Sequence, residues 1–349
     1  MNEVNSPQDL AARVQPGFKV VRTDRELEMT GVDERLRALG GTVVLLPDGT
    51  PEEVLAREVA DADLLLMCYA RITRRVIAGA GRLRGIVKYG VGIDAIDIDA
   101  AREHRVPVVN VPAYAEETVA EGAFALLLAL AKRFKPIQRA MDTEGWIWPE
   151  SRWIASDLAG KTLGLVGLGR IGRSMARMAA AFRMRVLACD PHVSADRWPA
   201  EVERCGDLLP MLAQADAVSL HCVLNAQTRH LIGARELAAL QPKAFLVNVS
   251  RGELIDEAAL LQTLQAGHLA GVALDVYGQE PLAREGHPLS ALYAMDRVIL
   301  WPHLTFYTRE AMQRLEDDTF ARCLEALAGE PMAVASTDPR LRAQIHGVR

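Results

Sequence analysis

The hexapeptide GLGRIG at residues 167–172 constrains the fold of this chain more than any other feature, because of what flanks it. Residues 161–166 are apolar and β-branched enough for a strand, and residues 175–182 are apolar and helix-forming. Between a strand and a helix, the first glycine allows a sharp turn and the second lets backbone approach a pyrophosphate. The third lets the helix pack on the strand. The pattern predicts a dinucleotide-binding unit, although three glycines alone also fit an ordinary turn.

An acidic residue identifies the expected dinucleotide. A second apolar run at residues 184–189 ends at Asp190, shortly after the glycine turn and its helix. An acid at the tip of the second strand accepts hydrogen bonds from the adenosine ribose of NAD and repels the 2′-phosphate of NADP. We therefore expect NAD rather than NADP.

Composition sets the broad class. With 349 residues, half of them hydrophobic, the chain is long enough for about two domains with sizeable cores. The net charge of −5 and the lack of a basic run argue against nucleic acid and anionic membranes as partners. The longest apolar run, residues 122–131, is far shorter than the ~20 residues that span a bilayer. Residues 1–17 do not resemble a secretory signal, so we expect a cytoplasmic protein.

The five cysteines are widely spread, without a C-x-x-C pair or metal-ligand spacing. We expect reduced, mostly buried thiols and no metal site.

Two stretches of alternating strand and helix patterns predict two parallel sheets, each with helices on both faces. The first stretch runs from residue 18 to residue 111 and the second from residue 161 to residue 300. A helix at 116–134 joins them, and an aromatic loop at 142–153 follows it. A last helix at 309–328 returns to the first domain, and a loosely held tail follows residue 330. We expect a mobile extension at 1–17, a substrate domain at 18–115 plus 306–335, and a cofactor domain at 116–305.

The loop YGVGID at residues 89–94 leaves a buried strand of the first domain. Its glycines let consecutive N–H groups point the same way and form a nest for an anion such as a carboxylate. A purely structural turn fits the loop equally well.

Three polar residues follow predicted strands of the second domain, where open α/β sheets bind ligands: Arg251, Glu280 and His303. An arginine can hold a carboxylate with two hydrogen bonds, and a histidine exchanges protons near neutral pH. A glutamate beside the histidine would orient the imidazole and favour its charged form. Each residue also has a structural alternative: a surface ion pair, a turn or a core histidine.

Several motifs together resemble the D-isomer-specific 2-hydroxyacid dehydrogenase family, from about Val20 to Leu327. The matching stretches are residues 90–97, 118–121, 248–252, 273–276, 280–281 and 302–303, together with the glycine turn and Asp190. The resemblance implies an α/β protein of two doubly wound parallel-sheet domains, with a Rossmann NAD-binding domain inserted into a flavodoxin-like substrate domain. It also implies a homodimer formed through the long helix and neighbouring loops.

The resemblance assigns roles to individual residues. Arg251 binds substrate, His303 is the acid/base paired with Glu280, and Val91 and Gly92 offer N–H groups to the substrate carboxylate. The implied cofactor-binding residues are Thr118, Gly167, Gly169, Arg170, Ile171, Gly172, Asp190, Cys222, Val249, Ser250, Asp275, which meets the carboxamide, and His303.

The sequence also departs from the family. Gly122 stands where a histidine is frequent, and Phe306 stands where a small residue is usual, close to His303. The bulky ring is expected to narrow the pocket. We expect no long regulatory domain after residue 335, and this expectation argues against the extended phosphoglycerate type.

These features predict an NAD-dependent oxidoreductase that interconverts a small 2-keto acid and its D-2-hydroxy acid. One alternative is a phosphite- or formate-type anion dehydrogenase of the same family. Another is an NAD(H)-sensing interaction protein similar to the C-terminal-binding co-repressors.

Overall fold

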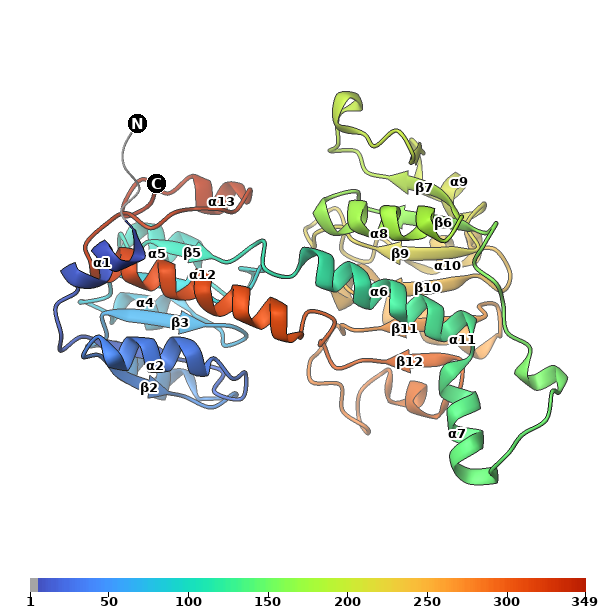
Figure 1. The fold of residues 1–349 in the computed structure, drawn as a ribbon, viewed down its shortest axis with the longest axis horizontal. Coiled ribbons are helices and arrows are strands. Elements are labelled where there is room, and N and C mark those ends of the chain that lie inside the picture. Colours follow the sequence, from blue (N-terminus) through green and yellow to red (C-terminus); the bar gives the residue numbers. More distant parts are fainter. Residues whose placement is uncertain (1–5) are drawn as a thin grey trace. The chain divides into compact units, whose positions relative to one another are not determined.

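The computed structural model describes residues 6–349, which divide into two compact units (Figure 1). Unit 1 comprises the residues up to Ala115 together with Thr308–Arg349, and unit 2 comprises Glu116–Tyr307. The chain therefore returns to unit 1 between residues 307 and 308, two positions later than the predicted boundary between residues 305 and 306. Within residues 6–349, no helix is both long enough and apolar enough to cross a membrane.

Unit 1 is built on a five-stranded parallel sheet with the strand order β2-β1-β3-β4-β5. Helices cover both faces: α3, α4 and α5 pack over one apolar cluster, while α12 packs on α2 and on β4. This strand order is that of flavodoxin-like sheets. Its strands are β1 (Lys19–Arg22), β2 (Thr42–Leu45), β3 (Leu64–Met67), β4 (Gly85–Lys88) and β5 (Val108–Asn110). Its helices are α1 (Pro7–Arg13), α2 (Thr30–Ala38), α3 (Glu52–Val59), α4 (Arg74–Ala78), α5 (Ile98–Glu103), α12 (Arg309–Leu327) and α13 (Pro339–Arg342).

Unit 2 is built on a seven-stranded parallel sheet with the order β12-β11-β10-β9-β6-β7-β8. This is the Rossmann order. Successive strands are added on one side of β6 and then, from β9 onward, on its other side. The two-residue strand β8 has no apolar run and was not predicted. The strands are β6 (Thr162–Val166), β7 (Arg185–Cys189), β8 (Glu203–Arg204), β9 (Ala217–Leu220), β10 (Phe245–Asn248), β11 (Gly271–Leu274) and β12 (Val298–Leu300).

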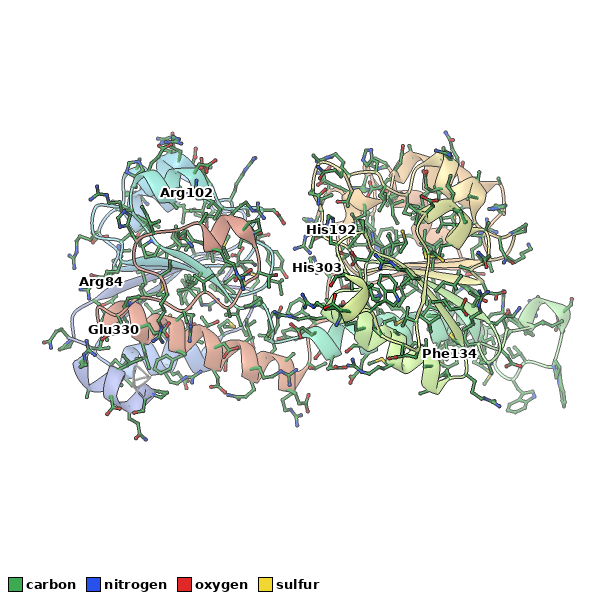
Figure 2. All side chains as sticks on the ribbon, turned by 90° about the horizontal axis from the view of Figure 1, so that it is seen from above. Arg84, Arg102, Phe134, His192, His303 and Glu330 are labelled. Atoms are coloured by element: carbon green, nitrogen blue, oxygen red, sulfur yellow. The ribbon has the colours of Figure 1, made fainter. Side chains whose placement is uncertain are left out.

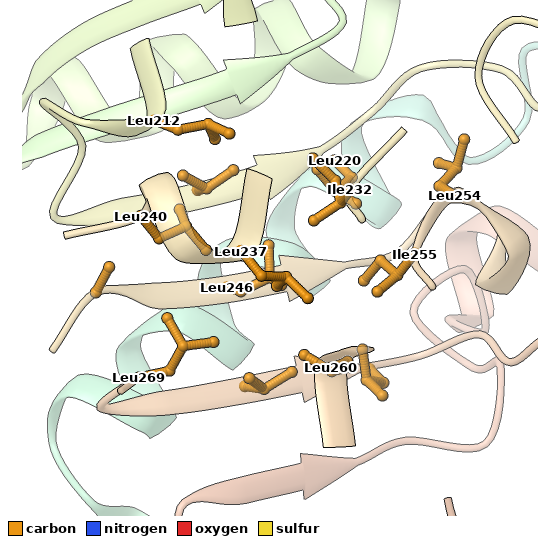
Figure 3. Close-up of a cluster of buried hydrophobic side chains, with 14 of the residues drawn as sticks. Leu212, Leu220, Ile232, Leu237, Leu240, Leu246, Leu254, Ile255, Leu260 and Leu269 are labelled. Atoms are coloured by element: carbon orange, nitrogen blue, oxygen red, sulfur yellow. The ribbon is translucent and has the colours of Figure 1, made fainter. Parts of the chain in front are cut away.

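Helices lie on both faces of this sheet as well. One apolar cluster lies under α6 and α8, and the other lies under α9, α10 and α11 (Figure 3). The helices are α6 (Glu116–Ala131), α7 (Phe134–Glu144), α8 (Arg170–Ala181), α9 (Leu208–Leu212), α10 (Ala234–Ala239) and α11 (Glu257–Gln265), with 3₁₀ turns η1 (Ser151–Trp153), η2 (Ala195–Arg197), η3 (Gly252–Leu254) and η4 (Ser290–Ala294). The α/β prediction of two doubly wound parallel sheets is confirmed.

The predicted helix over residues 116–134 is wrong at its C-terminal end. Helix α6 ends at Ala131, and Arg133 adopts the left-handed conformation with φ of 57°, so α7 starts in a new direction at Phe134. Helix α7 then runs into the predicted aromatic loop as far as Glu144. The apolar run of α6 did not indicate this break, because no sequence pattern marks an arginine that adopts the left-handed backbone conformation.

Both chain ends contain more regular structure than predicted. Helix α1 occupies part of the expected extension; Ser6 and Asp9 cap it reciprocally, and Leu10 is buried. At the other end, Met332 and Val348 form a parallel bridge, and the Arg349 guanidinium lies 2.7 Å from the buried Glu325 carboxylate. The segment after residue 335 thus belongs to unit 1, where side-chain contacts distant in sequence hold it.

All five cysteines are free thiols, but the expectation that most of them are buried is wrong. Cys68 and Cys323 are buried, whereas Cys189, Cys205 and Cys222 are half-buried.

Leu260 tests the core of unit 2, because it is fully buried in the cluster under α11. We expect Leu260→Ala to lower the free energy of unfolding by about 2–5 kcal/mol, through lost apolar contacts and the cavity left behind. Urea unfolding followed by circular dichroism measures this. Ile345→Ala, at a side chain that is 80% exposed, is the control and should change it by less than about 0.5 kcal/mol. Equal effects of both substitutions would contradict the assigned core.

Candidate active site

The glycine turn follows β6 at the point where the strand order reverses. Gly167 has a φ of 94°, and a Cβ there would lie 2.7 Å from the Cys222 nitrogen. A Cβ on Gly172 would lie 2.4 Å from the Gly167 carbonyl oxygen, because α8 and β6 pack closely there. A Cβ on Gly169 would meet no atom within 4 Å. Two glycines are therefore required by packing, and the middle one leaves backbone open to a ligand.

Helix α8 begins directly after Gly169, so Arg170 and Ile171 lie in its first turn. The first N–H groups of a helix have no partner within it and carry positive partial charge. The Arg170 guanidinium forms an ion pair with Glu116 at 2.5 Å. The turn thus presents amide donors in the arrangement that phosphates favour.

Asp190 follows β7 and lies beside this turn. One of its carboxylate oxygens accepts a hydrogen bond from the Leu168 amide at 2.8 Å, and the other accepts one from the His192 amide at 2.8 Å. Each oxygen keeps a second acceptor position for a hydroxyl group. Together with the open backbone at Gly169, this donor and acceptor set fits a dinucleotide with a free ribose diol.

Residues after β9 and β10 lie at the same edge of the sheet. Ser250 donates a hydrogen bond to the Cys222 carbonyl at 2.6 Å, which joins the two loops. Burial raises the pKa of the Cys222 thiol to about 11, so the thiol stays protonated at neutral pH. Val249 is buried next to Ser250, and Thr118 is buried on α6.

Arg251 is positioned by backbone packing and by a side chain that our sequence reasoning missed. The Asn248 amide donates to the Arg251 carbonyl at 2.8 Å, and its oxygen accepts from the Ser250 amide at 3.1 Å. A Cβ on the following Gly252 would lie 1.9 Å from the Tyr277 carbonyl carbon. The sequence did contain a signal for this role of Asn248. An asparagine at the end of a buried strand often forms hydrogen bonds to the backbone of the turn that follows it.

His303 and Glu280 form a direct pair. The imidazole Nδ1 lies 2.8 Å from one Glu280 oxygen, and the other oxygen accepts from the Tyr277 amide at 3.0 Å. Burial favours the neutral acid, but the His303 hydrogen bond and charge, the Tyr277 amide and the charge of Arg251 together lower the pKa of Glu280. The imidazole and the carboxylate thus form a pair within unit 2, and the positive charge of Arg251 acts on the same carboxylate.

Asp275 contacts the segment that follows His303. Its carboxylate accepts hydrogen bonds from the Leu304 amide at 2.8 Å, the Thr305 amide at 3.2 Å and the Thr305 hydroxyl at 2.5 Å. His303 itself has a φ of 55°, an unusual conformation for a non-glycine residue. Asp275 therefore anchors the turn that carries the imidazole.

Two departures from the family also lie against this turn. A Cβ on Gly122 would lie 2.8 Å from the Thr305 Cβ, so a larger side chain would displace Thr305 from Asp275. The buried Phe306 ring lies edge-on to the His303 ring, with centroids 6.3 Å apart. Both residues shape the surroundings of His303.

In Figure 2, the labelled His303 and His192 follow β12 and β7 at the same edge of the unit 2 sheet. Val91 and Gly92 belong to unit 1, after β4. Residues 6–349 contain no cluster of three or more side chains able to hold a metal ion.

Comparison with known proteins adds the following. Residues 124–305 match the family model described as D-isomer specific 2-hydroxyacid dehydrogenase, NAD binding domain. The chain is 37% identical over 299 residues to a D-3-phosphoglycerate dehydrogenase of Mycobacterium bovis, covering 84% of this chain and 54% of that protein. It is 34% identical over 281 residues to a glyoxylate reductase of Thermococcus litoralis, covering 78% and 82%.

Solved structures are similar as well. A D-lactate dehydrogenase from Aquifex aeolicus, complexed with NAD and lactic acid, superposes with a TM-score of 0.79 at 28% identity, covering 89% of this chain and 96% of that one. The chain spans about half the length of the D-3-phosphoglycerate dehydrogenases that it matches.

The His303–Glu280 pair predicts an acid-dependent contribution to stability. Because the folded chain lowers the pKa of Glu280 from 4.5, the unfolded chain binds more protons in the acid range. The pair therefore stabilises the folded state above pH 4.5, and this stabilisation disappears as the pH falls through the folded-state pKa. We expect the stability advantage over Glu280→Gln to shrink in that window, as measured by urea unfolding at a series of pH values. A difference independent of pH would contradict the ionic pairing.

Proposed function

Because this chain belongs to the D-isomer specific 2-hydroxyacid dehydrogenase family, we propose that it is an NAD-dependent oxidoreductase that interconverts a small 2-keto acid and its D-2-hydroxy acid. The observation that supports this most is the His303–Glu280 pair, with the charge of Arg251 acting on the same carboxylate. An acid/base and a carboxylate-binding cation are the two groups that this reaction needs beside the cofactor.

Each residue has a distinct role in the proposed reaction. Arg251 binds the substrate carboxylate and polarises the carbonyl, because a guanidinium presents paired donors. Glu280 holds Nδ1 of His303, so the proton passes to or from the substrate oxygen through Nε2. Asp275 keeps the imidazole in place through Leu304 and Thr305. In unit 1, Val91 and Gly92 provide amide donors for the substrate carboxylate.

The cofactor-binding part lies at the glycine turn. The bound nicotinamide would supply or accept the hydride. The amides at the start of α8, with Arg170 and Ile171, would hold the pyrophosphate, and Asp190 would hold the adenosine ribose. Cys222, Val249, Ser250 and Thr118 would line the rest of the site.

Relatives leave a range of substrates, from glyoxylate to phosphorylated and lactate-type acids. Phe306 favours a short carbon chain, because its ring is buried against His303.

We also propose a homodimer formed through the segment that follows α6. Phe134, Trp146, Trp148 and Ile154 on this segment are all more than 60% exposed, which is unusual for large apolar side chains. A cavity of about 510 Å³ in the same unit lies beside Ile154, and its lining combines apolar side chains such as Phe245 and Met295 with charged ones such as Lys243 and Arg297.

A turnover screen tests the proposed reaction. NADH oxidation should accompany the reduction of at least one of glyoxylate, pyruvate and hydroxypyruvate. His303→Gln should lower turnover by about 10²-fold or more while NADH binding is retained, since the variant keeps the size of the side chain but not its proton exchange. Unchanged turnover in this variant would remove His303 from the reaction. NADH binding without turnover of any keto acid would instead favour the sensing alternative.

Asp190 tests the cofactor preference. Asp190→Ala should weaken NADH binding and reduce the preference for NADH over NADPH by about tenfold, because the ribose loses an acceptor and the 2′-phosphate is no longer repelled. Fluorescence titration of both dinucleotides measures this. Asp196→Ala, in the nearby turn η2, is the control. Tighter binding of NADPH by the wild-type protein would refute the assignment.

A further inference from the structure

Lys88 is a buried lysine at the edge of unit 1 where the proposed carboxylate-binding loop begins. It is the last residue of β4, and only 6% of it is exposed. Lysine is rarely buried to this degree, and when it is, a carboxylate normally accompanies it. The partners of its ammonium group therefore show whether a carboxylate is present beside it.

Those partners are neutral. The Lys88 Nζ donates to the Cys68 carbonyl at 2.6 Å and contacts the Cys68 sulfur at 3.1 Å. It also lies 5.5 Å from the centre of the Tyr69 ring. Within residues 6–349, no carboxylate forms an ion pair with Lys88.

The buried acid of this region is already occupied. The Asp24 carboxylate accepts hydrogen bonds from the amides of Cys68, Tyr69 and Ala70 and from the Thr23 hydroxyl. These bonds fix the loop after β3, and they leave Asp24 outside salt-bridge distance of Lys88. Among the described residues, no carboxylate thus pairs with the ammonium group, and an anion bound here would supply the missing negative charge.

The ammonium lies against the loop that carries the amide donors. Gly90 has a φ of 149°, and a Cβ on it would lie 2.9 Å from the Lys88 Nζ. In the described part of the chain, the amides of Val91 and Gly92 donate to no acceptor, and the Val91 carbonyl is held by Asn110 at 2.5 Å. The loop thus offers amide donors next to β5 and an ammonium next to β3, on its two flanks.

We propose that Lys88 is a specificity-determining residue that binds a second anionic group of the substrate. The 2-keto acids preferred here would carry a carboxylate or a phosphate ester in addition to the carboxylate at C1, and acids with a single carboxylate would bind more weakly. This inference rests on the proposed function, since it assigns the amides of Val91 and Gly92 to the C1 carboxylate. A purely structural lysine would affect all substrates alike, because it would act only on the shape of the loop.

Kinetics with two substrate classes separates these roles. Glyoxylate and hydroxypyruvate carry one negative charge, whereas oxaloacetate and 3-phosphohydroxypyruvate carry a second group that is a carboxylate or a phosphate. Lys88→Met keeps the length of the side chain without its charge, and it should raise KM for the second class by about tenfold or more. Its effect on the first class should stay below about threefold. Lys88→Arg should keep the preference. The control is Lys135→Met, which removes a partly buried lysine of unit 2 that donates to two carbonyl groups.

Binding provides a readout that does not need turnover. D-malate and D-lactate differ by one carboxylate, and their protection of the protein against thermal unfolding in the presence of NADH can be compared. D-malate should protect the wild-type protein more than D-lactate, and Lys88→Met should abolish the difference. If Lys88→Met does not fold, Lys88→Gln and the wild-type comparison serve the same purpose.

The outcomes distinguish the two proposals. The role of Lys88 would be overturned if Lys88→Met raised KM equally for both substrate classes. It would also be overturned if D-malate and D-lactate protected the wild-type protein equally against thermal unfolding. No turnover of any 2-keto acid by the wild-type protein would refute the proposed function, while a charge-dependent difference in protection would still support an anion site at Lys88.

Discussion

The parallel register of the strands is the constraint on which the site in unit 2 depends. Since every strand of the seven-stranded sheet runs in the same direction, the segments that follow β6, β7, β9, β10, β11 and β12 all emerge at one edge. Those segments carry the glycine turn, Asp190, Arg251 and His303. Residues more than a hundred positions apart thereby share one edge without any contact between them being needed to bring them there.

Carboxylates that accept hydrogen bonds from nearby loops then convert this general placement into definite geometry. Asp275 accepts three hydrogen bonds from Leu304 and Thr305, and Glu280 joins Nδ1 of His303 to the Tyr277 amide. Asp24 does the same in unit 1 for the loop after β3. Asp24 and Asp275 are buried and are stabilised by backbone amides, whereas Glu280 is more exposed and is held by one amide and the imidazole; in each case a loop gains a single conformation.

Close backbone packing has a comparable role at four glycines. Gly167 and Gly172 allow β6, α8 and the loop after β9 to meet, and Gly252 lets the Arg251 segment lie on Tyr277. Gly122 makes room on α6 for Thr305, which binds Asp275. Gly122 and Phe306 thus both border the surroundings of His303, whose imidazole pairs with Glu280.

The sequence by itself determined the fold class, the glycine turn and the three polar residues that follow strands, because hydrophobic periodicity and strand-end motifs are local patterns. It also predicted, by residue type and resemblance, that Arg251, Glu280 and His303 act in one reaction. The tertiary structure decided what depends on distant contacts: the break between α6 and α7 at Arg133, the ordered chain ends, and the anchoring of the His303 turn by Asp275. Lys88 shows the reason most clearly, since nothing in its sequence neighbourhood reveals that it is buried beside Cys68 without a carboxylate partner.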